Sequence, residues 1–148
     1  MKRLYPFNIF LSLWEKLDTL IQSNRLISPQ QVYEELKKWD DDVFWWVKQR
    51  RKLFRHPDEE QIAVAREILH RFPSLIDWQK ETADADPFVI SLAIVETRNL
   101  TLLSGKCSVV SHEKPGSRTR AKIPDVCNHY AIEHLLIVEF FSKEDWKF

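Results

Sequence analysis

Helix-forming stretches alternate with short, apolar, β-branched segments along this chain. The strand candidates are residues 26–28, 53–54, 107–111 and 132–136, of which the last two are the stronger. Parallel strands need helical crossovers, and such a sheet is covered by helices on both faces. The alternation therefore predicts an α/β fold whose short parallel sheet is thin for the number of helices around it.

The helices are predicted from apolar spacing and from start signals. They cover residues 10–21, 29–39, 43–49, 57–72 and 137–143, and two more begin near Pro87 and Ile123. Ser28 before Pro29 predicts a helix start, with Pro at the first helical position, and Asp40 or Asp41 is expected to cap the next helix. Residues 88–95 are apolar nearly all round, which predicts a buried helix.

Composition excludes several classes of function. Glycine occurs only twice, so the chain has no Gly-rich phosphate cradle and no dinucleotide fingerprint. Lys plus Arg and Asp plus Glu both number 22, so any nucleic-acid contact must come from a local basic patch. The length of 148 residues predicts a single domain. We expect a soluble, cytoplasmic protein, because no apolar run is long enough for a membrane span or a secretory signal. Cys107 and Cys127 have no metal-type spacing and are expected to be free thiols.

Three carboxylates are placed where local structure could aim them at a shared site. Glu35 lies at the border of the apolar stripe of its helix, whereas Glu34 faces water. Asp86 precedes the buried helix, where the alternative role is an N-cap. Glu113 follows a predicted strand, at the edge where open α/β sheets keep their ligands. Each residue has a simpler interpretation as a surface or capping residue, and only their combination predicts a site.

Two basic clusters could hold a nucleic-acid backbone. The cluster nearer to Glu113 is a loop that contains Lys114, Arg118, Arg120 and Lys122, and the other cluster spans residues 48–55. A solvated surface is the alternative for both clusters. The run Phe44-Trp45-Trp46-Val47 has more apolar surface than one helix face needs, so core packing or a partner-binding patch would explain it.

Several motifs resemble those of PIN domains. Residues 28–37 (SPQQVYEELK) resemble the second acidic motif, residues 85–93 (ADPFVISLA) the third, and residues 109–113 (VVSHE) the strand and Thr-x-Asp motif that carries the fourth. Residues 122–127 (KIPDVC) and the ending from Glu139 to Phe148 look like one bacterial PIN-like family, formerly of unknown function and akin to VapC-type toxins. The resemblance covers essentially all 148 residues and implies one PIN-like domain with a three-layer α/β/α fold.

The first PIN motif has no counterpart here. PIN domains open with an apolar strand that ends in a metal-binding Asp, whereas this chain begins with what normally follows that strand. The expected explanation is a start codon placed too late. The alternative is an N-terminally truncated homologue with impaired activity. If the 148-residue form cuts RNA, another carboxylate must replace the missing Asp, with Asp84 and Asp125 as the first candidates.

The resemblance implies hydrolysis of RNA by an endoribonuclease, the toxin of a toxin–antitoxin module. Glu35, Asp86 and Glu113 would hold Mg²⁺ or Mn²⁺ and carry catalysis, and the basic loop would bind RNA. A cognate antitoxin or a second copy of the chain would be the protein partner. The competing interpretation is a non-catalytic, degenerate PIN-like module that binds RNA or a protein.

Overall fold

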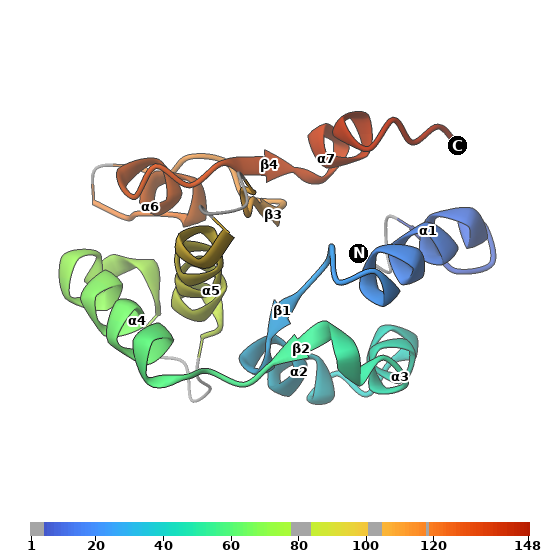
Figure 1. Ribbon diagram of the computed structural model, residues 1–148, viewed down its shortest axis with the longest axis horizontal. Coiled ribbons are helices and arrows are strands. Elements are labelled where there is room, and N and C mark those ends of the chain that lie inside the picture. The colour runs from blue at the N-terminus through green and yellow to red at the C-terminus, as the bar shows by residue number, and fades with distance from the viewer. Residues whose placement is uncertain (1–4, 78–83, 101–104, 118) are drawn as a thin grey trace. The chain divides into compact units, whose positions relative to one another are not determined.

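The computed structural model describes residues 5–77, 84–100, 105–117 and 119–148. Its contacts divide the chain into two compact units, an N-terminal unit of Met1–His56 with Phe148 and a C-terminal unit of Pro57–Lys147. Figure 1 labels the helices and strands of both units. Whether the chain is one domain, as the sequence predicts, stays a prediction.

The N-terminal unit is built from helices around one pair of very short strands. Its elements are α1 (Leu11–Gln22), β1 (Ser28–Pro29), α2 (Gln30–Lys37), α3 (Asp42–Lys48), the 3₁₀ helix η1 (Arg51–Leu53) and β2 (Phe54–Arg55). The strands β1 and β2 pair in parallel, with Ser28 opposite Phe54. The core of this unit is a cluster of buried side chains from Ile21, Tyr33, Phe44, Val47, Leu53 and Phe54.

Helix α1 confirms the prediction made from apolar spacing. Its buried residues are Leu13, Trp14, Leu17, Leu20 and Ile21. They recur at intervals of three and four, so they form the single apolar stripe of an amphipathic helix. Asp41 caps α3 as expected, since its side chain accepts a hydrogen bond from the backbone N–H of Phe44 at 3.1 Å.

Helix α2 begins later than its start signal predicted. Ser28 and Pro29 form a strand, and the helix starts at Gln30. The parallel pairing with β2 requires extended backbone at these two residues, and Pro29 has φ −71° and ψ 153°. The pairing therefore overrides the local helix signal. The buried residue of α2 is Tyr33, which the predicted stripe did not include.

The C-terminal unit carries the longer helices. Its elements are α4 (Glu59–Arg71), the 3₁₀ helix η2 (Pro73–Leu75), α5 (Asp86–Leu100), β3 (Val109–Ser111), α6 (Ile123–His129), β4 (His134–Leu136) and α7 (Ile137–Lys143). Asp58 caps α4 by accepting the backbone N–H of Gln61 at 2.8 Å. Helix α7 has the bounds that the sequence predicts.

Helix α5 is the centre of the C-terminal unit. Six consecutive residues of α5, from Ile90 to Val95, are buried, as the all-round apolar pattern predicted. Its neighbours in the core come from α4, β3 and α6, through Val64, Ile68, Val109, Ile123 and Val126 among others. The polar Ser91 side chain is fully buried, and its hydroxyl donates to the carbonyl of Phe88 at 3.1 Å.

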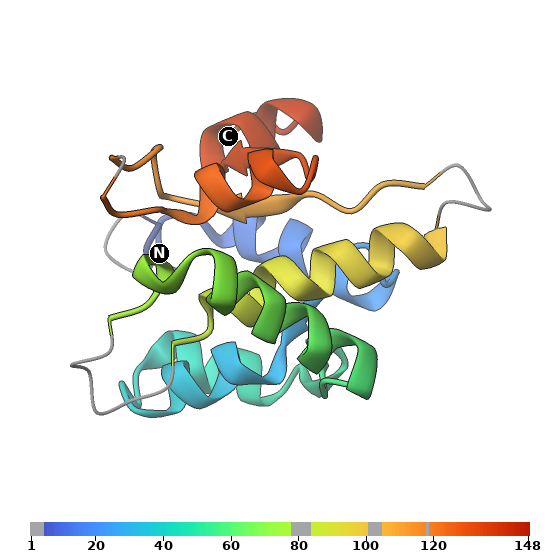
Figure 2. The same cartoon turned by 90° about the vertical axis from the view of Figure 1, so that its left-hand side faces the viewer.

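Strand β3 returns along α5 and pairs in parallel with β4. The backbone N–H of Cys107 donates to the Thr97 hydroxyl at 3.3 Å, so the chain re-enters beside the last turns of α5. Figure 2 shows the segment that contains β3 running back in the direction opposite to α5. Val109, Val110 and Ser111 pair with His134, Leu135 and Leu136. In this register β3 and β4 end side by side, with Ser111 opposite Leu136.

The strands form two parallel pairs, β1–β2 and β3–β4, among the described residues. The mixed α/β class and the parallel direction are confirmed. The expectation of one continuous sheet is not met among the described residues, because the two strand pairs belong to different units. Within the described ranges, each helix is too short or too polar to serve as a membrane span.

Candidate functional site

Asp86 lies in the first turn of α5. The helix begins at Asp86, one residue earlier than the capping interpretation requires. The N–H groups of Phe88 and Val89 donate to the carbonyl of Ala85, at 2.9 and 3.0 Å. The side chain of Asp84 accepts the backbone N–H of Asp86 at 3.0 Å. Asp84 therefore supports the start of the helix, and Asp86 contributes a carboxylate near the positive end of the helix dipole.

Glu113 lies two residues beyond the end of β3 and is half-buried. Its backbone N–H donates to the hydroxyl of Ser111 at 3.1 Å. Its side-chain Oε2 accepts the backbone N–H of Ile123, the first residue of α6, at 3.0 Å. These two bonds fix the carboxylate beside the strand end, and Oε1 makes no hydrogen bond to any residue that the structure describes.

Asp86 and Glu113 belong to the same end of the α5–β3 pair. Because β3 runs opposite to α5, the residues after β3 return toward the first turn of that helix. About eleven helical residues separate Thr97 from Asp86, or roughly 16 Å at 1.5 Å per residue. The extended path from Cys107 to Glu113 covers a similar distance, roughly 20 Å at 3.3 Å per residue. The two carboxylates therefore lie at similar heights along the C-terminal unit.

Asp125 organises the loop of residues 113–122. Its Oδ2 accepts the backbone N–H groups of Gly116 and Lys122, each at 2.8 Å. Gly116 lies close to the chain on the far side of the loop, since a Cβ atom there would be 2.2 Å from the carbonyl oxygen of Arg120. The N–H of Ala121 donates to the Ser74 hydroxyl at 3.0 Å. The loop is therefore fixed at both ends by side-chain acceptors.

The cations of this loop have different degrees of exposure. Lys114 and Arg120 are exposed, whereas Lys122 is half-buried, and Arg118 lies outside the described residues. An open pocket of about 500 Å³ lies between η2 and the loop, with Ser74, Gly116 and Asp125 in its wall. The loop thus presents exposed positive charge beside a surface depression.

Sequence reasoning missed a contact of His134, to which the sequence assigned no role. The Nε2 atom of His134 lies 2.7 Å from the hydroxyl of Ser111, across the β3–β4 pair. Burial lowers the pKa of His134, and the carboxylates of Glu139 and Glu113 partly oppose this effect. A neutral His134 can accept a hydrogen bond from the Ser111 hydroxyl, while the Ser111 oxygen accepts a hydrogen bond from the backbone N–H of Glu113. No sequence signal predicts this contact, because it depends on the register between two strands.

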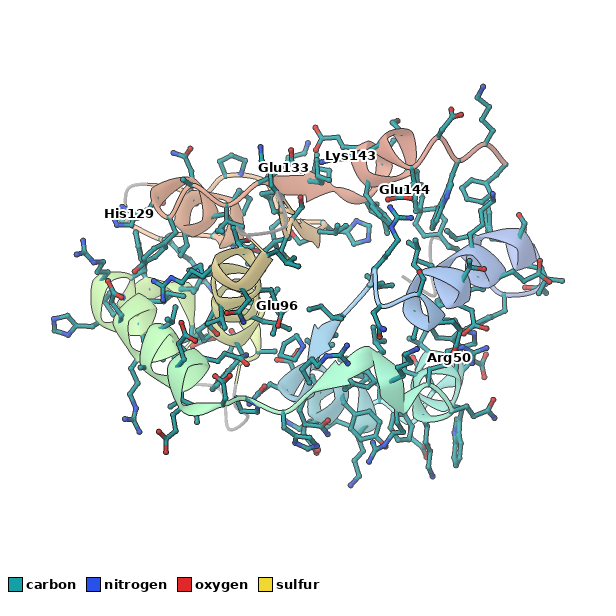
Figure 3. The ribbon with its side chains drawn as sticks, in the orientation of Figure 1. Arg50, Glu96, His129, Glu133, Lys143 and Glu144 are labelled. Carbon is teal, nitrogen blue, oxygen red and sulfur yellow. The ribbon has the colours of Figure 1, made fainter. Side chains whose placement is uncertain are left out.

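A second set of contacts is made by Glu133, the residue before β4, and includes Lys143 of α7. Glu133 Oε1 accepts the Ser108 hydroxyl at 2.6 Å and contacts the ammonium group of Lys143 (Figure 3). The hydrogen bond from Lys143, followed by that from Ser108, lowers the pKa of Glu133. This carboxylate therefore has a structural role and is no candidate ligand.

Glu35 lies on α2 in the N-terminal unit and is half-buried, whereas Glu34 is exposed and bonds to Gln30 at 3.2 Å. The predicted orientation of both side chains is confirmed. Among the described residues, no three His, Cys, Asp or Glu side chains are grouped so that they could hold a metal ion. The predicted ligand set combines Glu35 with residues of the C-terminal unit and stays a prediction.

The carboxylates of the C-terminal unit have the chemistry that a hard divalent cation requires. Mg²⁺ and Mn²⁺ prefer oxygen ligands, and Mg²⁺ is often held by one or two carboxylates while it keeps several waters. Glu113 fits this role because one oxygen is fixed by Ile123 while the other makes no bond to a described residue. Asp125 fits it less well, because its Oδ2 already accepts two backbone N–H groups.

Comparison with known proteins adds one finding. A family model described as a domain of unknown function (DUF4411) matches residues 1–148. The chain belongs to the DUF4411 family. No curated protein and no solved structure matches it significantly. Membership of DUF4411 carries no assigned activity, so the function must be argued from the residues themselves.

Proposed function

We propose that this DUF4411 protein is a PIN-like endoribonuclease that requires Mg²⁺ or Mn²⁺. Asp86 and Glu113 would hold the metal, together with Glu35. The observation that carries the proposal is the position of Glu113, two residues beyond a parallel strand, with its carboxylate fixed by the backbone N–H of Ile123. Open α/β folds bind ligands at that edge.

The sequence motifs support the same residues. Asp86, Glu113 and Glu35 each belong to one of the three stretches that resemble PIN motifs. Two of them, Asp86 and Glu113, are 27 residues apart in the sequence. The segment that contains β3 runs back in the direction opposite to α5 (Figure 2), which supports the proposal that both residues lie toward the start of that helix.

The chain's own groups would position the RNA and hold the ligands. When bound, the metal would activate a water and neutralise charge on the phosphate. Lys114 and Arg120 project from the same loop that Glu113 begins, so they would bind the phosphates next to the cleaved bond. The bond from Ile123 to Glu113 keeps the carboxylate from rotating away from its site.

A ribonuclease of this kind would act in the cytoplasm as the toxin of a toxin–antitoxin module. A cognate antitoxin or a second copy of the chain would then cover part of its surface. Exposed apolar side chains on both units offer surface for such a partner, among them Trp39 and Val138.

The alternative is a non-catalytic module that binds RNA or a protein. Two observations favour it. The described residues hold no group of three metal-binding side chains, and Oδ2 of Asp125 already accepts two backbone N–H groups in the loop. In that case Glu113 would serve only to join β3 to α6.

Cleavage of a labelled RNA distinguishes the two functions. The nuclease should cut single-stranded RNA with Mn²⁺ or Mg²⁺, stop in EDTA, and lose activity on Asp86→Asn and on Glu113→Gln. Glu67→Gln, an exposed change on α4, is the matched control and should cleave like the wild type. RNA binding without any metal-dependent cleavage would overturn the nuclease and favour the module.

A further inference from the structure

An exposed tryptophan of the N-terminal unit lies in a continuous cluster of aromatic rings and cations. The ring centroids of Tyr33 and Phe44 are 5.5 Å apart, and those of Phe44 and Trp45 are 5.8 Å apart. The ammonium of Lys48 lies 4.5 Å from the Trp45 centroid, and the guanidinium of Arg51 lies 4.3 Å from the Tyr33 centroid. We call these five residues the aromatic–cation surface.

The outer and inner members of this surface differ in burial. Tyr33 and Phe44 are buried and belong to the core of the unit. Trp45 is 51% exposed, and Lys48 and Arg51 are exposed as well. The rigid core therefore presents one indole ring and two cations to solvent.

The positive charge of this region is largely uncompensated. Five of the eight residues from 48 to 55 are Lys or Arg, and none is acidic. Arg50, labelled in Figure 3, is the one of these five cations that has a carboxylate partner among the described residues. Its guanidinium pairs with Asp18 at 2.8 Å and lies over the Trp46 ring. Lys48, Arg51, Lys52 and Arg55 have no carboxylate partner among the described residues, and Lys52 and Arg55 bond only to backbone carbonyls.

A cation held over an aromatic ring has no counter-charge beside it, whereas the charge of a cation in an ion pair is balanced by its partner. The contacts of Lys48 and Arg51 with rings therefore restrict where these charges lie without neutralising them. An anionic ligand would meet cations that are already ordered. It would also meet the exposed indole of Trp45 beside Lys48, on which a planar group can stack.

We propose that the aromatic–cation surface binds single-stranded nucleic acid, with a base stacked on Trp45 and backbone phosphates on Lys48 and Arg51. Stacking rings combined with a positive surface are how proteins bind single strands without sequence preference. A duplex does not fit as well, because its bases are stacked on each other and their faces are not accessible. The proposal deepens the RNA-binding part of the proposed function and needs neither the metal nor Asp86.

Three other features were weaker candidates for an additional site. The pocket beside the 113–122 loop belongs to the site already described. Val138 and Phe148 are exposed, but nothing shows what covers them. The thiol of Cys127 is fully buried. Among these candidates in the described part of the chain, the aromatic–cation surface is the one that combines charge, order and an exposed ring.

The test is fluorescence anisotropy of a labelled single strand of about 12 uridines, within the usual site sizes of single-strand-binding proteins. It uses the whole chain in EDTA, so that no cleavage occurs. Trp45→Ala should weaken binding about 5- to 150-fold, the range for the loss of one stacked base. Trp45→Phe should restore most of the affinity, and circular dichroism should show that both variants fold.

Two matched controls locate the surface. Trp39→Ala removes a tryptophan that is 77% exposed but has no ring or cation contact in the described residues, and it should bind normally. Lys48→Gln and Arg51→Gln should each reduce the salt dependence, the slope of log K against log salt, by about 0.7. Arg66→Gln, an exposed change on α4, should leave that slope unchanged.

Several results would overturn the proposal. These are equal binding by Trp45→Ala and wild type, an equal loss in Trp39→Ala, or equal affinity for a duplex of the same length. A monomer–dimer equilibrium that depends on Trp45, without oligonucleotide binding, would assign this surface to a second copy instead. Failure of binding here differs from failure of the nuclease, because binding is measured in EDTA, where no metal-dependent cleavage occurs, and cleavage is measured separately with Mn²⁺.

Discussion

Oε2 of Glu113 accepts the backbone N–H of Ile123 at 3.0 Å, so one carboxylate joins the end of β3 to the start of α6. The same residue is a proposed metal ligand. The two roles need different properties of the side chain, since the hydrogen bond needs an acceptor oxygen and the metal needs negative charge.

Substitutions of Glu113 separate these roles. Glu113→Gln keeps an acceptor oxygen, so the free energy of unfolding should fall by only a few tenths of a kcal/mol, whereas metal-dependent cleavage should be lost. Glu113→Ala leaves the Ile123 N–H without its acceptor and should cost about 1–2 kcal/mol. Urea unfolding and cleavage assays measure both quantities. Equal stability of the two variants would show that the bond to Ile123 contributes little.

Asp84 and Asp86 can be separated in the same way. Asp86→Asn removes a first-turn charge, so it should cost about 0.5 kcal/mol and abolish metal binding. Asp84→Ala removes the acceptor of the Asp86 N–H and should cost about 1 kcal/mol while metal binding persists. Thermal melts and metal titrations check both variants. Loss of metal on Asp84→Ala would make Asp84 a ligand.

Gly116 should not tolerate a side chain. A Cβ atom there would lie 2.2 Å from the carbonyl oxygen of Arg120, so Gly116→Ala must displace the loop and weaken its bond to Asp125. We expect a loss of about 1–3 kcal/mol and weaker RNA binding. Gly105→Ala is the control, since its nearest contact is a side-chain atom, Cβ of Leu100, at 3.1 Å. Chemical denaturation of both variants tests this, and equal losses would contradict it.

The thiol of Cys127 should be unreactive in the folded protein. Burial raises its pKa from 9.0 to about 12, so almost no thiolate forms near neutral pH. Cys107 is only half-buried and should react first with a disulfide reagent, whereas both free thiols should react after unfolding. Rapid reaction of both in the native state would contradict the buried position.

The same shift predicts a pH dependence of stability. Because the folded pKa is raised, the neutral thiol contributes fully below about pH 9, and its contribution is lost as the pH rises toward about 12. Cys127→Ala should therefore lose less stability over that range than the wild type does. Melting temperatures of the two forms at several alkaline pH values check the difference.

Local signals predicted the elements well, and long-range contacts could not be predicted. The cap at Asp41, the opposite orientations of Glu34 and Glu35, and the bounds of α7 depend on neighbours in sequence. The start of α2 was wrong because Ser28 and Pro29 pair with β2, which is 25 residues away. A pairing partner at that distance overrides a capping signal.

The candidate site shows the same limit. The positions of Asp86 at a helix start and of Glu113 beyond a strand end were predicted from the sequence, whereas their role as ligands stays a prediction. The contact of Ser111 with His134 depends on strand register, and that of Ser74 with Ala121 on folding 47 residues apart. Neither contact produces a periodic pattern in the sequence from which it could be predicted. The structural roles of Asp84 and Asp125, both predicted as possible ligands, also came only from the fold.

Binding of Mn²⁺ tests most directly whether Asp86 and Glu113 share a metal ion. Free Mn²⁺ can be followed by electron paramagnetic resonance as it is titrated into the 148-residue chain. We predict one weak site that both Asp86→Asn and Glu113→Gln abolish and that the surface control Glu67→Gln retains. The absence of any Mn²⁺ site, or a site that survives in both variants, would contradict the proposed function.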